Sequence, residues 1–213
     1  MTLWFMTSNE GKVAEAKEHF SHFGIEVKQF DFEATEPQTD DLEIVALSKI
    51  DQAIPFIPDE NDMILVEDAG LFIEALEGFP GVYSSYALQT IGCGGVLKLL
   101  SHLESEDLVV DAKIRRAEFR AVAVLYHKGV TKLAEGVCPG RISHNIAEGE
   151  GFGFDPIFIP TDLDENGDPV ETGEMGVTST HGNTFGQISL EEKQLYSHRR
   201  RAISNLISNL DFQ

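Results

Sequence analysis

A short apolar run that ends in two adjacent acids, residues 63–68, constrains the fold more than any other segment. Met, Ile, Leu and Val occupy 63–66, and Glu67 and Asp68 follow directly. Such a run is typical of a buried strand. Burying carboxylates is costly unless a partner compensates their charge, so we expect a cation at the end of this strand. Gly70 predicts a sharp turn just beyond it. A solvated strand end with two surface acids is the alternative.

The N-terminal segment predicts a second strand, at 2–6, and a helical pattern follows it at 12–23. The helix is amphipathic, because its apolar residues recur at spacings of three and four and so share one face. Those apolar residues are Val13, Ala16, Phe20 and Phe23. The polar loop 7–12 therefore joins the end of a strand to the start of a helix.

That loop has the features of an anion site. Free backbone N–H groups and the helix dipole attract anions to a helix N-terminus, and Lys12 adds a full positive charge. Short polar side chains precede it at Thr7, Ser8 and Asn9. The loop is not a Walker A motif, because Val13 stands where that motif needs Ser or Thr. Helix capping by Ser8 or Asn9 is the alternative explanation.

A glycine-rich segment at 149–158 alternates three glycines with an acid and an aromatic residue, and then reaches Asp155 and Pro156. Glycines permit the close approach of a ligand. An aromatic side chain on such a loop can stack on a nucleotide base, and a carboxylate can accept hydrogen bonds from the edge of the base. A glycine-rich hairpin with a core phenylalanine is the alternative.

Two capped helices are predicted near the C-terminus. Ser189 and Glu192 form a capping-box pattern that begins the first helix. Ser197 can cap a second helix, whose first turn carries His198 followed by three arginines at 199–201. Cations are unfavourable at a helix N-terminus, so an external anion explains this cluster better than helix propensity does. A surface basic patch is the alternative.

Together these segments resemble the inosine triphosphate pyrophosphatase family, which hydrolyses non-standard purine nucleoside triphosphates such as ITP, dITP and XTP. The resemblance extends from Thr7 to about Arg201. It implies a phosphate loop near the N-terminus, a metal and catalytic segment after the acidic strand, and a base-recognition loop in the glycine-rich segment. The substrate-binding residues that it implies are Thr7, Ser8, Asn9, Glu10, Gly11, Lys12, Lys49, Ala69, Phe152, Gly153, Phe154, Asp155, Lys193, His198 and Arg199.

The chemistry that the resemblance implies is attack of water on the α-phosphorus, which releases the monophosphate and pyrophosphate. Charge builds on the phosphate oxygens, so Mg²⁺, or Mn²⁺ in its place, and a lysine must offset it. Glu36, Glu67 and Asp68 are the expected metal ligands, because Mg²⁺ prefers oxygen ligands. Asp68 is also the expected base for water, and Lys12 the expected catalytic cation. Lys49 is a further phosphate contact, or else part of a solvated helix face.

Two departures from the family pattern stand out. Asn183 and Gln187 flank the pair Thr184 and Phe185, and both are neutral. The family usually has a lysine and a glutamate around such a Thr-Phe pair. The stretch 162–182 is also longer and more acidic than usual, and it is predicted to be a surface loop.

A nucleotide-binding sensor without turnover remains an alternative function. A related pyrophosphatase that acts on pyrimidine or modified nucleotides is another.

Composition limits the partners. The 213 residues predict a single domain with two lobes. The net charge is −20, with 36 acids against 16 Lys and Arg, which argues against broad binding to nucleic acid. Cys93 and Cys138 are too few for a disulfide framework or a zinc site, which fits a cytoplasmic protein. No apolar run reaches membrane-spanning length. The resemblance implies a homodimer.

The predicted fold class is α/β, with a long mixed sheet flanked by helices and two lobes around a central nucleotide cleft. Asp40 and Glu43 offer a capping box for the second helix. The predicted strands are 2–6, 25–30, 63–68, 71–75, 116–127, 130–137, 141–147 and 156–159. The predicted helices are 12–23, 41–54, 84–91, 94–103 and the two near the C-terminus.

Overall fold

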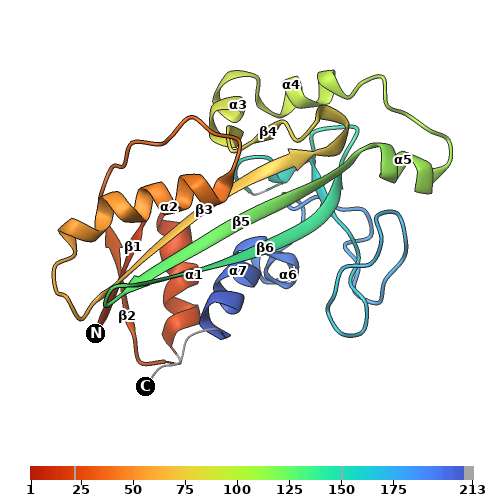
Figure 1. Cartoon of the computed structure of the whole chain (residues 1–213). Helices are drawn as coiled ribbons and strands as arrows, with labels where there is room; N and C mark the ends of the chain where they lie inside the picture. The colour runs from red at the N-terminus through yellow and green to blue at the C-terminus, as the bar shows by residue number, and fades with distance from the viewer. Residues whose placement is uncertain (22, 150, 209–213) are drawn as a thin grey trace. The chain divides into compact units, whose positions relative to one another are not determined.

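The computed structural model describes residues 1–21, 23–149 and 151–208 and has an α/β fold (Figure 1). The strands form a seven-stranded mixed sheet in the order β2-β1-β3-β5-β6-β7, and β4 pairs with β3. They are β1 Thr2–Met6, β2 Glu26–Phe30, β3 Met63–Ile73, β4 Pro80–Gly81, β5 Arg116–His127, β6 Val130–Ile142 and β7 Phe158–Pro160. The predicted fold class, a mixed sheet flanked by helices, is confirmed.

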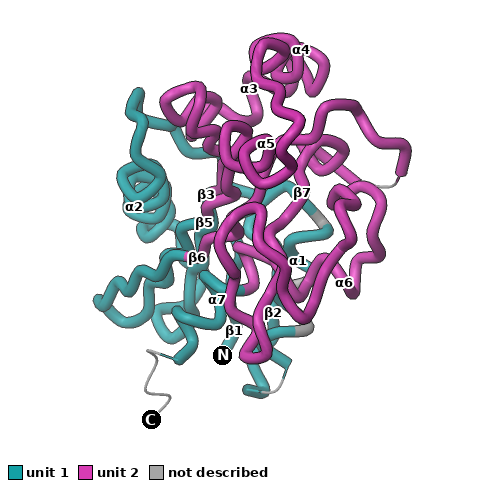
Figure 2. Tube along the Cα trace, turned by 90° about the vertical axis from the view of Figure 1, so that its right-hand side faces the viewer, with its two compact units in different colours: residues 1–68, 121–135, 201–213 teal, residues 69–120, 136–200 magenta. Residues whose placement is uncertain are grey.

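The chain divides into two units, coloured separately in Figure 2. Unit 1 comprises Met1–Asp68, Ala121–Glu135 and Arg201–Gln213, and unit 2 comprises Ala69–Arg120 and Gly136–Arg200. The α-helices of the described chain are α1 Glu10–Ser21, α2 Leu42–Ala53, α3 Ser84–Thr90, α4 Gly92–Leu99, α5 Leu108–Ile114, α6 Leu190–Tyr196 and α7 His198–Ser208. None of these helices is both long and apolar enough to span a membrane. The predicted cleft between lobes stays a prediction.

Unit 1 begins with two β-α-β connections. β1 pairs in parallel with β2 and with β3, so that Leu3 lies beside Val27 on one side and Met63 on the other. Since α1 leads to β2 and α2 leads back across β1 to β3, right-handed crossovers place the two helices on opposite faces of these strands. Figures 1 and 2 show α2 on one face and α1 on the other.

The apolar face predicted for α1 is confirmed over the helix itself. Val13, Ala16 and Phe20 are buried against the strands. Phe23 is 46% exposed, because α1 ends at Ser21 and Phe23 lies beyond the helical repeat. The prediction that Phe23 shares the buried face is therefore wrong.

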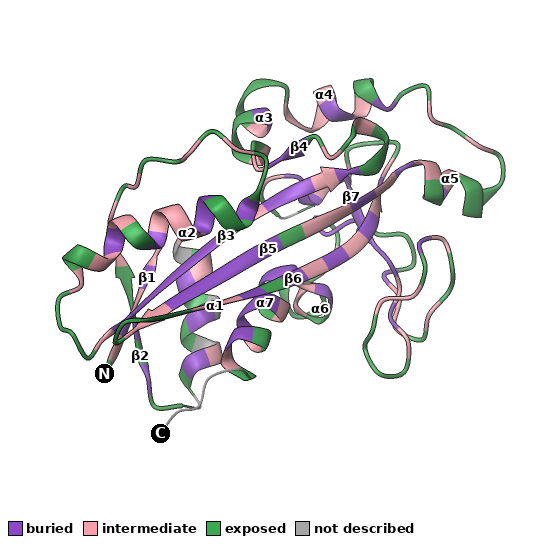
Figure 3. Cartoon of the chain, viewed as in Figure 1, coloured by how far each residue is buried: buried purple, intermediate pink, exposed green. Residues whose placement is uncertain are grey.

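Unit 2 has its own apolar core, in which aromatic rings pack around β7 and α6. The rings of Phe158 and Phe185 lie 5.1 Å apart, and the ring of Tyr196 lies 6.4 Å from that of Phe185. Other members include Leu71, Ile73, Val96, Leu100, Ala117, Ile142, Phe154 and Leu163. Figure 3 shows the buried residues concentrated along the strands. Burial of this apolar surface is the main stabilising contribution to such a core.

The turn predicted at Gly70 is wrong. β3 runs without interruption from Met63 to Ile73 and joins the two strands predicted at 63–68 and 71–75. A Cβ at Gly70 would lie 2.3 Å from the carbonyl oxygen of Gly81. Glycine is therefore needed here for the close approach of β4 rather than for a turn.

Other predictions differ in detail. The N-cap of α2 is Asp41 rather than Asp40, and its side chain accepts from the N–H of Glu43 and of Ile44. The strands predicted at 130–137 and 141–147 correspond to β6, which ends at Ile142, and α5 was not predicted. The loop predicted at 162–182 is confirmed, and it is held by bridges from the buried Leu163 to Pro169 and Thr178. The capping box of α6, formed by Ser189 and Glu192, is confirmed.

Candidate active site

Five charged side chains of unit 1 gather around the end of β1 and the middle of β3. We call them the lysine–carboxylate cluster: Lys12, Glu36, Lys49, Glu67 and Asp68. Lys12 lies in the first turn of α1, Lys49 lies in α2, and Glu36 lies in the segment that precedes α2. The structure thus brings together in ion pairs the three acids and two of the lysines that the sequence predicted for metal and phosphate.

The two acids of β3 point to opposite faces of the strand, as adjacent strand residues do. Glu67 reaches Lys12 of α1, and Asp68 reaches Lys49 of α2. α1 and α2 lie on opposite sides of β3 (Figure 2). The cluster therefore has two parts, one with Glu67 and the other with Asp68 and Glu36.

The first part is a buried ion pair. Lys12 Nζ lies 2.5 Å from Glu67 Oε2, and the Glu67 side chain is fully buried while that of Lys12 is 18% exposed. A buried carboxylate is tolerated when an opposite charge is held close to it. Glu67 thus fixes the position of the Lys12 ammonium near the start of α1.

The second part is a lysine between two carboxylates. Lys49 Nζ lies 2.5 Å from Asp68 Oδ2 and 2.7 Å from Glu36 Oε1. Burial alone would lower the pKa of Lys49, but Asp68 and Glu36 outweigh it and raise that pKa above its usual value. Burial raises the pKa of Asp68, although Lys49 and Lys12 act in the opposite direction. A carboxylate with a raised pKa is a better base than an ordinary one.

The loop before α1 is shaped by Asn9. Its side-chain oxygen accepts from the backbone N–H of Gly11 at 2.9 Å and of Lys12 at 3.2 Å. The Thr7 hydroxyl oxygen accepts from the N–H of Asn9 at 3.2 Å, while Ser8 is exposed. Capping by Asn9, the alternative explanation of this loop, is confirmed, and it leaves the Lys12 ammonium as the main cationic group there. The Glu10 side chain lies outside the described part of the structure.

A divalent cation fits the part of the cluster that contains Glu36 and Asp68. Both carboxylates contact one positive charge, the Lys49 ammonium, so their oxygens converge on a cation position. Mg²⁺ is commonly bound by one or two carboxylates together with waters and substrate oxygens. No group of three or more His, Cys, Asp or Glu side chains in the described residues is arranged to hold a metal ion unaided. Water and substrate would therefore have to supply most of the ligands.

A second set of predicted site residues lies in unit 2, and we call it the aromatic–cationic cluster: Phe152, Asp155, Lys193, His198 and Arg199. Asp155 is buried, and its Oδ2 accepts from Lys193 Nζ at 2.6 Å and from the backbone N–H of Phe152 at 3.1 Å. Lys193 Nζ also lies 5.1 Å from the centre of the Phe152 ring, within cation–π distance. These contacts tie the glycine-rich loop to α6.

The first turn of α7 begins as predicted, because the Ser197 hydroxyl accepts from the N–H of Arg200 at 3.2 Å. His198 and Arg199 are each only 7% exposed, so the alternative of a surface basic patch is wrong for these two residues. The His198 ring stacks on that of Phe119 at 5.0 Å, with an angle of 13° between the planes. The imidazole plane is thereby set by β5.

The two phenylalanines of the glycine-rich loop have different surroundings. Phe152 is 57% exposed, whereas Phe154 is 3% exposed and belongs to the core of unit 2. Phe152 is therefore the ring that can stack on a ligand. Gly153 has a φ of 68°, which favours glycine. A Cβ at Gly149 would lie 1.8 Å from the carbonyl oxygen of Gly186, so this glycine serves backbone packing rather than ligand approach.

Phe119 and Phe185 are site residues that the sequence did not single out. Phe119 stacks on His198, and the Phe185 ring centre lies 5.2 Å from Lys193 Nζ. Phe119 lies within the strand predicted at 116–127, but that prediction said nothing of a stacked imidazole. Ala69, another predicted substrate contact, lies half-buried in β3 directly after Asp68.

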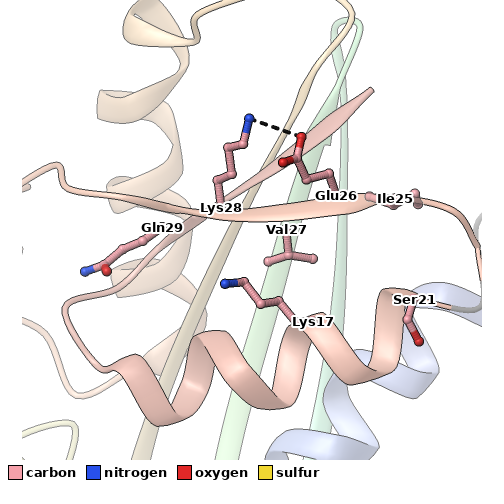
Figure 4. A pocket seen from close by; sticks show the side chains of 7 residues that line it. All are labelled: Lys17, Ser21, Ile25, Glu26, Val27, Lys28 and Gln29. Atoms are coloured by element: carbon pink, nitrogen blue, oxygen red, sulfur yellow. Dashed lines mark ion pairs between the residues drawn. The ribbon is translucent and has the colours of Figure 1, made fainter.

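A surface hollow of about 540 Å³ lies beside α1 and the edge strand β2 (Figure 4). Its lining residues are Lys17, Ser21, Ile25, Glu26, Val27, Lys28 and Gln29. None of them is a predicted site residue. Lys28 in this hollow is paired with Glu26 at 3.1 Å. The hollow therefore shares no lining residue with the lysine–carboxylate cluster.

Comparisons with known proteins agree with the resemblance. The model of the Ham1 family matches residues 3–209. The dITP/XTP pyrophosphatase of Pyrococcus horikoshii is 38% identical over 204 residues, which cover 95% of this chain and 93% of that protein. The dITP/XTP pyrophosphatase of Thermococcus kodakarensis is also 38% identical, with 95% and 94% covered. The solved structure of the Staphylococcus aureus Ham1 protein matches with a TM-score of 0.72 and 27% identity, covering 98% of this chain and 97% of that one.

Proposed function

The chain belongs to the Ham1 family, and from this premise we propose that it hydrolyses non-standard purine nucleoside triphosphates to the monophosphate and pyrophosphate. The substrates are dITP, ITP and XTP, and the activity removes them from the nucleotide pool. The observation that carries the proposal is the pairing of Lys12 with Glu67 and of Lys49 with Asp68 in unit 1. A binding module needs cations for phosphate but has no need of a carboxylate with a raised pKa beside them.

The lysine–carboxylate cluster is proposed to act on the triphosphate. Lys12, held by Glu67, and Lys49 bind phosphate oxygens and offset the negative charge that grows there. Asp68 orients the attacking water and accepts its proton, since its pKa is raised by burial. Bound Mg²⁺ supplies further charge neutralisation at the phosphate oxygens. Glu36 and Asp68 would hold it, whereas Glu67, which was also predicted as a ligand, pairs with Lys12 on the opposite face of β3.

The aromatic–cationic cluster is proposed to recognise the base. The exposed ring of Phe152 stacks on the purine, and the buried His198 and Arg199 donate to its 6-oxo group. Lys193 and Asp155 hold the loop that carries Phe152. A 6-oxo purine is favoured over a pyrimidine because two donors and a stacking ring suit its larger edge and surface.

One assay tests the proposal. The purified protein is incubated with Mg²⁺ and ITP, and the products are separated and measured. We expect IMP and pyrophosphate in equal amounts. IDP and orthophosphate would contradict the proposed attack at the α-phosphorus. Tight binding of ITP without any product would favour the nucleotide sensor, and faster turnover of a pyrimidine triphosphate would favour the related pyrophosphatase.

The protein is also proposed to be a cytoplasmic homodimer. Support for the location comes from Cys93 and Cys138, which are both free thiols, as expected in a reducing compartment. Support for the dimer comes from the family resemblance alone. Light scattering on the purified protein tests the dimer, and a mass of one chain, 23.5 kDa, would contradict it.

A further inference from the structure

We propose that Lys49 is a resident counter-ion at the cation position between Glu36 and Asp68, and that a divalent metal ion binds there only as its ammonium withdraws. The inference rests on the proposed function for the metal and for the triphosphate. It adds a second role for Lys49: the chain itself provides the cation that competes with the metal.

The contacts of Lys49 carry the inference. Its Nζ lies 2.7 Å from Glu36 Oε1 and 2.5 Å from Asp68 Oδ2, so a single ammonium contacts both carboxylates. The side chains of Lys49 and Asp68 are only 17% and 19% exposed, whereas that of Glu36 is 61% exposed. Water screens the Asp68 contact less than the Glu36 contact, and so the bond to Asp68 is the stronger of the two.

A divalent ion and the ammonium cannot both occupy this position. Both are cations, and their repulsion at such short range is strong in a partly buried site. Lys49 must therefore exchange its carboxylate partners for others when the metal binds. The oxygens of a triphosphate are suitable new partners, because an ammonium binds phosphate as a point charge.

The exchange couples the two ligands. In the absence of nucleotide, the ammonium of Lys49 that the metal displaces would have no phosphate to bind, so the metal binds weakly. Nucleotide provides the new partner and strengthens metal binding, and by linkage metal strengthens nucleotide binding by the same factor. Typical coupling of this kind is about 5- to 150-fold in affinity.

Lys12 provides a matched comparison within the same cluster. It carries the same charge and is similarly buried, but its ion pair is with Glu67, on the opposite face of β3. A general effect of removing positive charge would act at Lys12 and at Lys49 alike. Competition for one position acts at Lys49 alone.

The test measures Mn²⁺ binding to the nucleotide-free protein by electron paramagnetic resonance. Wild type, Lys49→Met and Lys12→Met are compared after circular dichroism has shown that each is folded. We expect Lys49→Met to bind Mn²⁺ about tenfold more tightly than wild type, within the usual range of coupling, and Lys12→Met to change little. An equal gain in Mn²⁺ affinity in both variants would overturn the proposal, and so would an unchanged Mn²⁺ affinity in Lys49→Met.

A second measurement needs no variant. The side-chain ¹⁵N resonance of Lys49 in wild type should shift when Mg²⁺ is added, and that of Lys12 should shift less; an unmoved Lys49 resonance would contradict the exchange. Neither measurement uses turnover. A protein that binds Mn²⁺ as expected but hydrolyses no nucleotide would leave this inference standing and refute the proposed function.

Discussion

The ammonium of Lys193 lies 2.6 Å from the carboxylate of Asp155, and the Asp155 side chain is 5% exposed. The same carboxylate oxygen accepts from the backbone N–H of Phe152. One buried acid thus connects α6 to the loop that presents an exposed aromatic ring. This arrangement makes Asp155 a residue that orders the proposed base site without needing to touch the phosphates.

Asp155→Asn should therefore weaken binding of ITP more than it slows turnover. The amide keeps the shape of the side chain but removes the ion pair with Lys193. Contacts that are equally strong in ground and transition states affect KM and leave kcat largely unchanged. We expect KM for ITP to rise about tenfold, since a hydrogen bond to a charged group contributes about 1.5–3 kcal/mol. Steady-state kinetics measure this.

Glu148 offers a matched control for this change, because it lies directly before the glycine-rich segment and is exposed. Glu148→Gln should leave KM near the wild-type value. An unchanged KM in Asp155→Asn, or an equal change in both variants, would show that the ion pair does not order the base site.

Asp68→Asn should abolish most of the turnover. The substitution keeps the shape of the side chain but removes a carboxylate whose pKa is raised by burial. Loss of a positioned general base typically costs about 10²–10⁴ in rate. Nucleotide binding should partly survive, which calorimetry with a non-hydrolysable ITP analogue measures. A variant with near-normal turnover would assign the base to another residue.

Removal of divalent metal should stop the reaction. Glu36 and Asp68 converge on one cation position, and the phosphate charge in the transition state needs more compensation than two lysines provide. We expect no product in excess EDTA and full recovery when Mg²⁺ or Mn²⁺ is restored. Continued turnover in metal-free buffer would refute the role proposed for these carboxylates.

Much of the fold could be predicted because its signals are local. The apolar run at 63–66 predicted the strand that carries Glu67 and Asp68, and the pattern of Ser189 and Glu192 predicted the start of α6. The turn at Gly70 could not be predicted correctly. Glycine suits both a turn and a close backbone contact, and only the position of Gly81 in β4 shows which applies.

The sequence could propose the residues of the candidate site, but it could not predict their arrangement. The motif identified Glu67 and Asp68 as neighbours in sequence, yet strand alternation sends their side chains to α1 and α2 on opposite faces. Deriving this requires the order of β1, β2 and β3 in the sheet. The stacking of His198 on Phe119 joins residues far apart in the chain, and no local pattern encodes it.

The Arg115→Met variant should have a much lower free energy of unfolding than wild type. Arg115 is 2% exposed, and its guanidinium donates to four backbone carbonyls at 2.7–3.1 Å. Those carbonyls belong to Ile142, Leu100, Leu103 and Ser143. Each such bond to a charged donor contributes about 1.5–3 kcal/mol, so we expect the free energy of unfolding to fall by more than about 3 kcal/mol. Urea titration measures the fall.

The neighbouring Arg116 is the matched control. It is 40% exposed and pairs with Glu171 at 2.9 Å on the surface, where ion pairs contribute less than about 1 kcal/mol. Arg116→Met should therefore have nearly wild-type stability. Similar losses in both variants would mean that charge, rather than the buried hydrogen bonds, determines the effect.

Arg199→Ala should reduce the preference for ITP over ATP. ITP and XTP carry a 6-oxo acceptor, whereas ATP carries a 6-amino donor that Arg199 and His198 would face unfavourably. A site built around hydrogen bonds rejects a mismatched ligand strongly, because its buried polar groups are left unpaired. We expect wild type to prefer ITP over ATP by at least about 10²-fold in kcat/KM. The kcat/KM for XTP should be close to that for ITP. The kcat/KM for GTP should be no better than intermediate, because GTP shares the 6-oxo group but adds a 2-amino group. In Arg199→Ala the preference should shrink chiefly through loss of ITP turnover.

Arg200→Ala is the control, because Arg200 is exposed in the same turn of α7. Wild-type protein that hydrolyses ATP as fast as ITP would refute the base recognition proposed here, even if pyrophosphate remained the product.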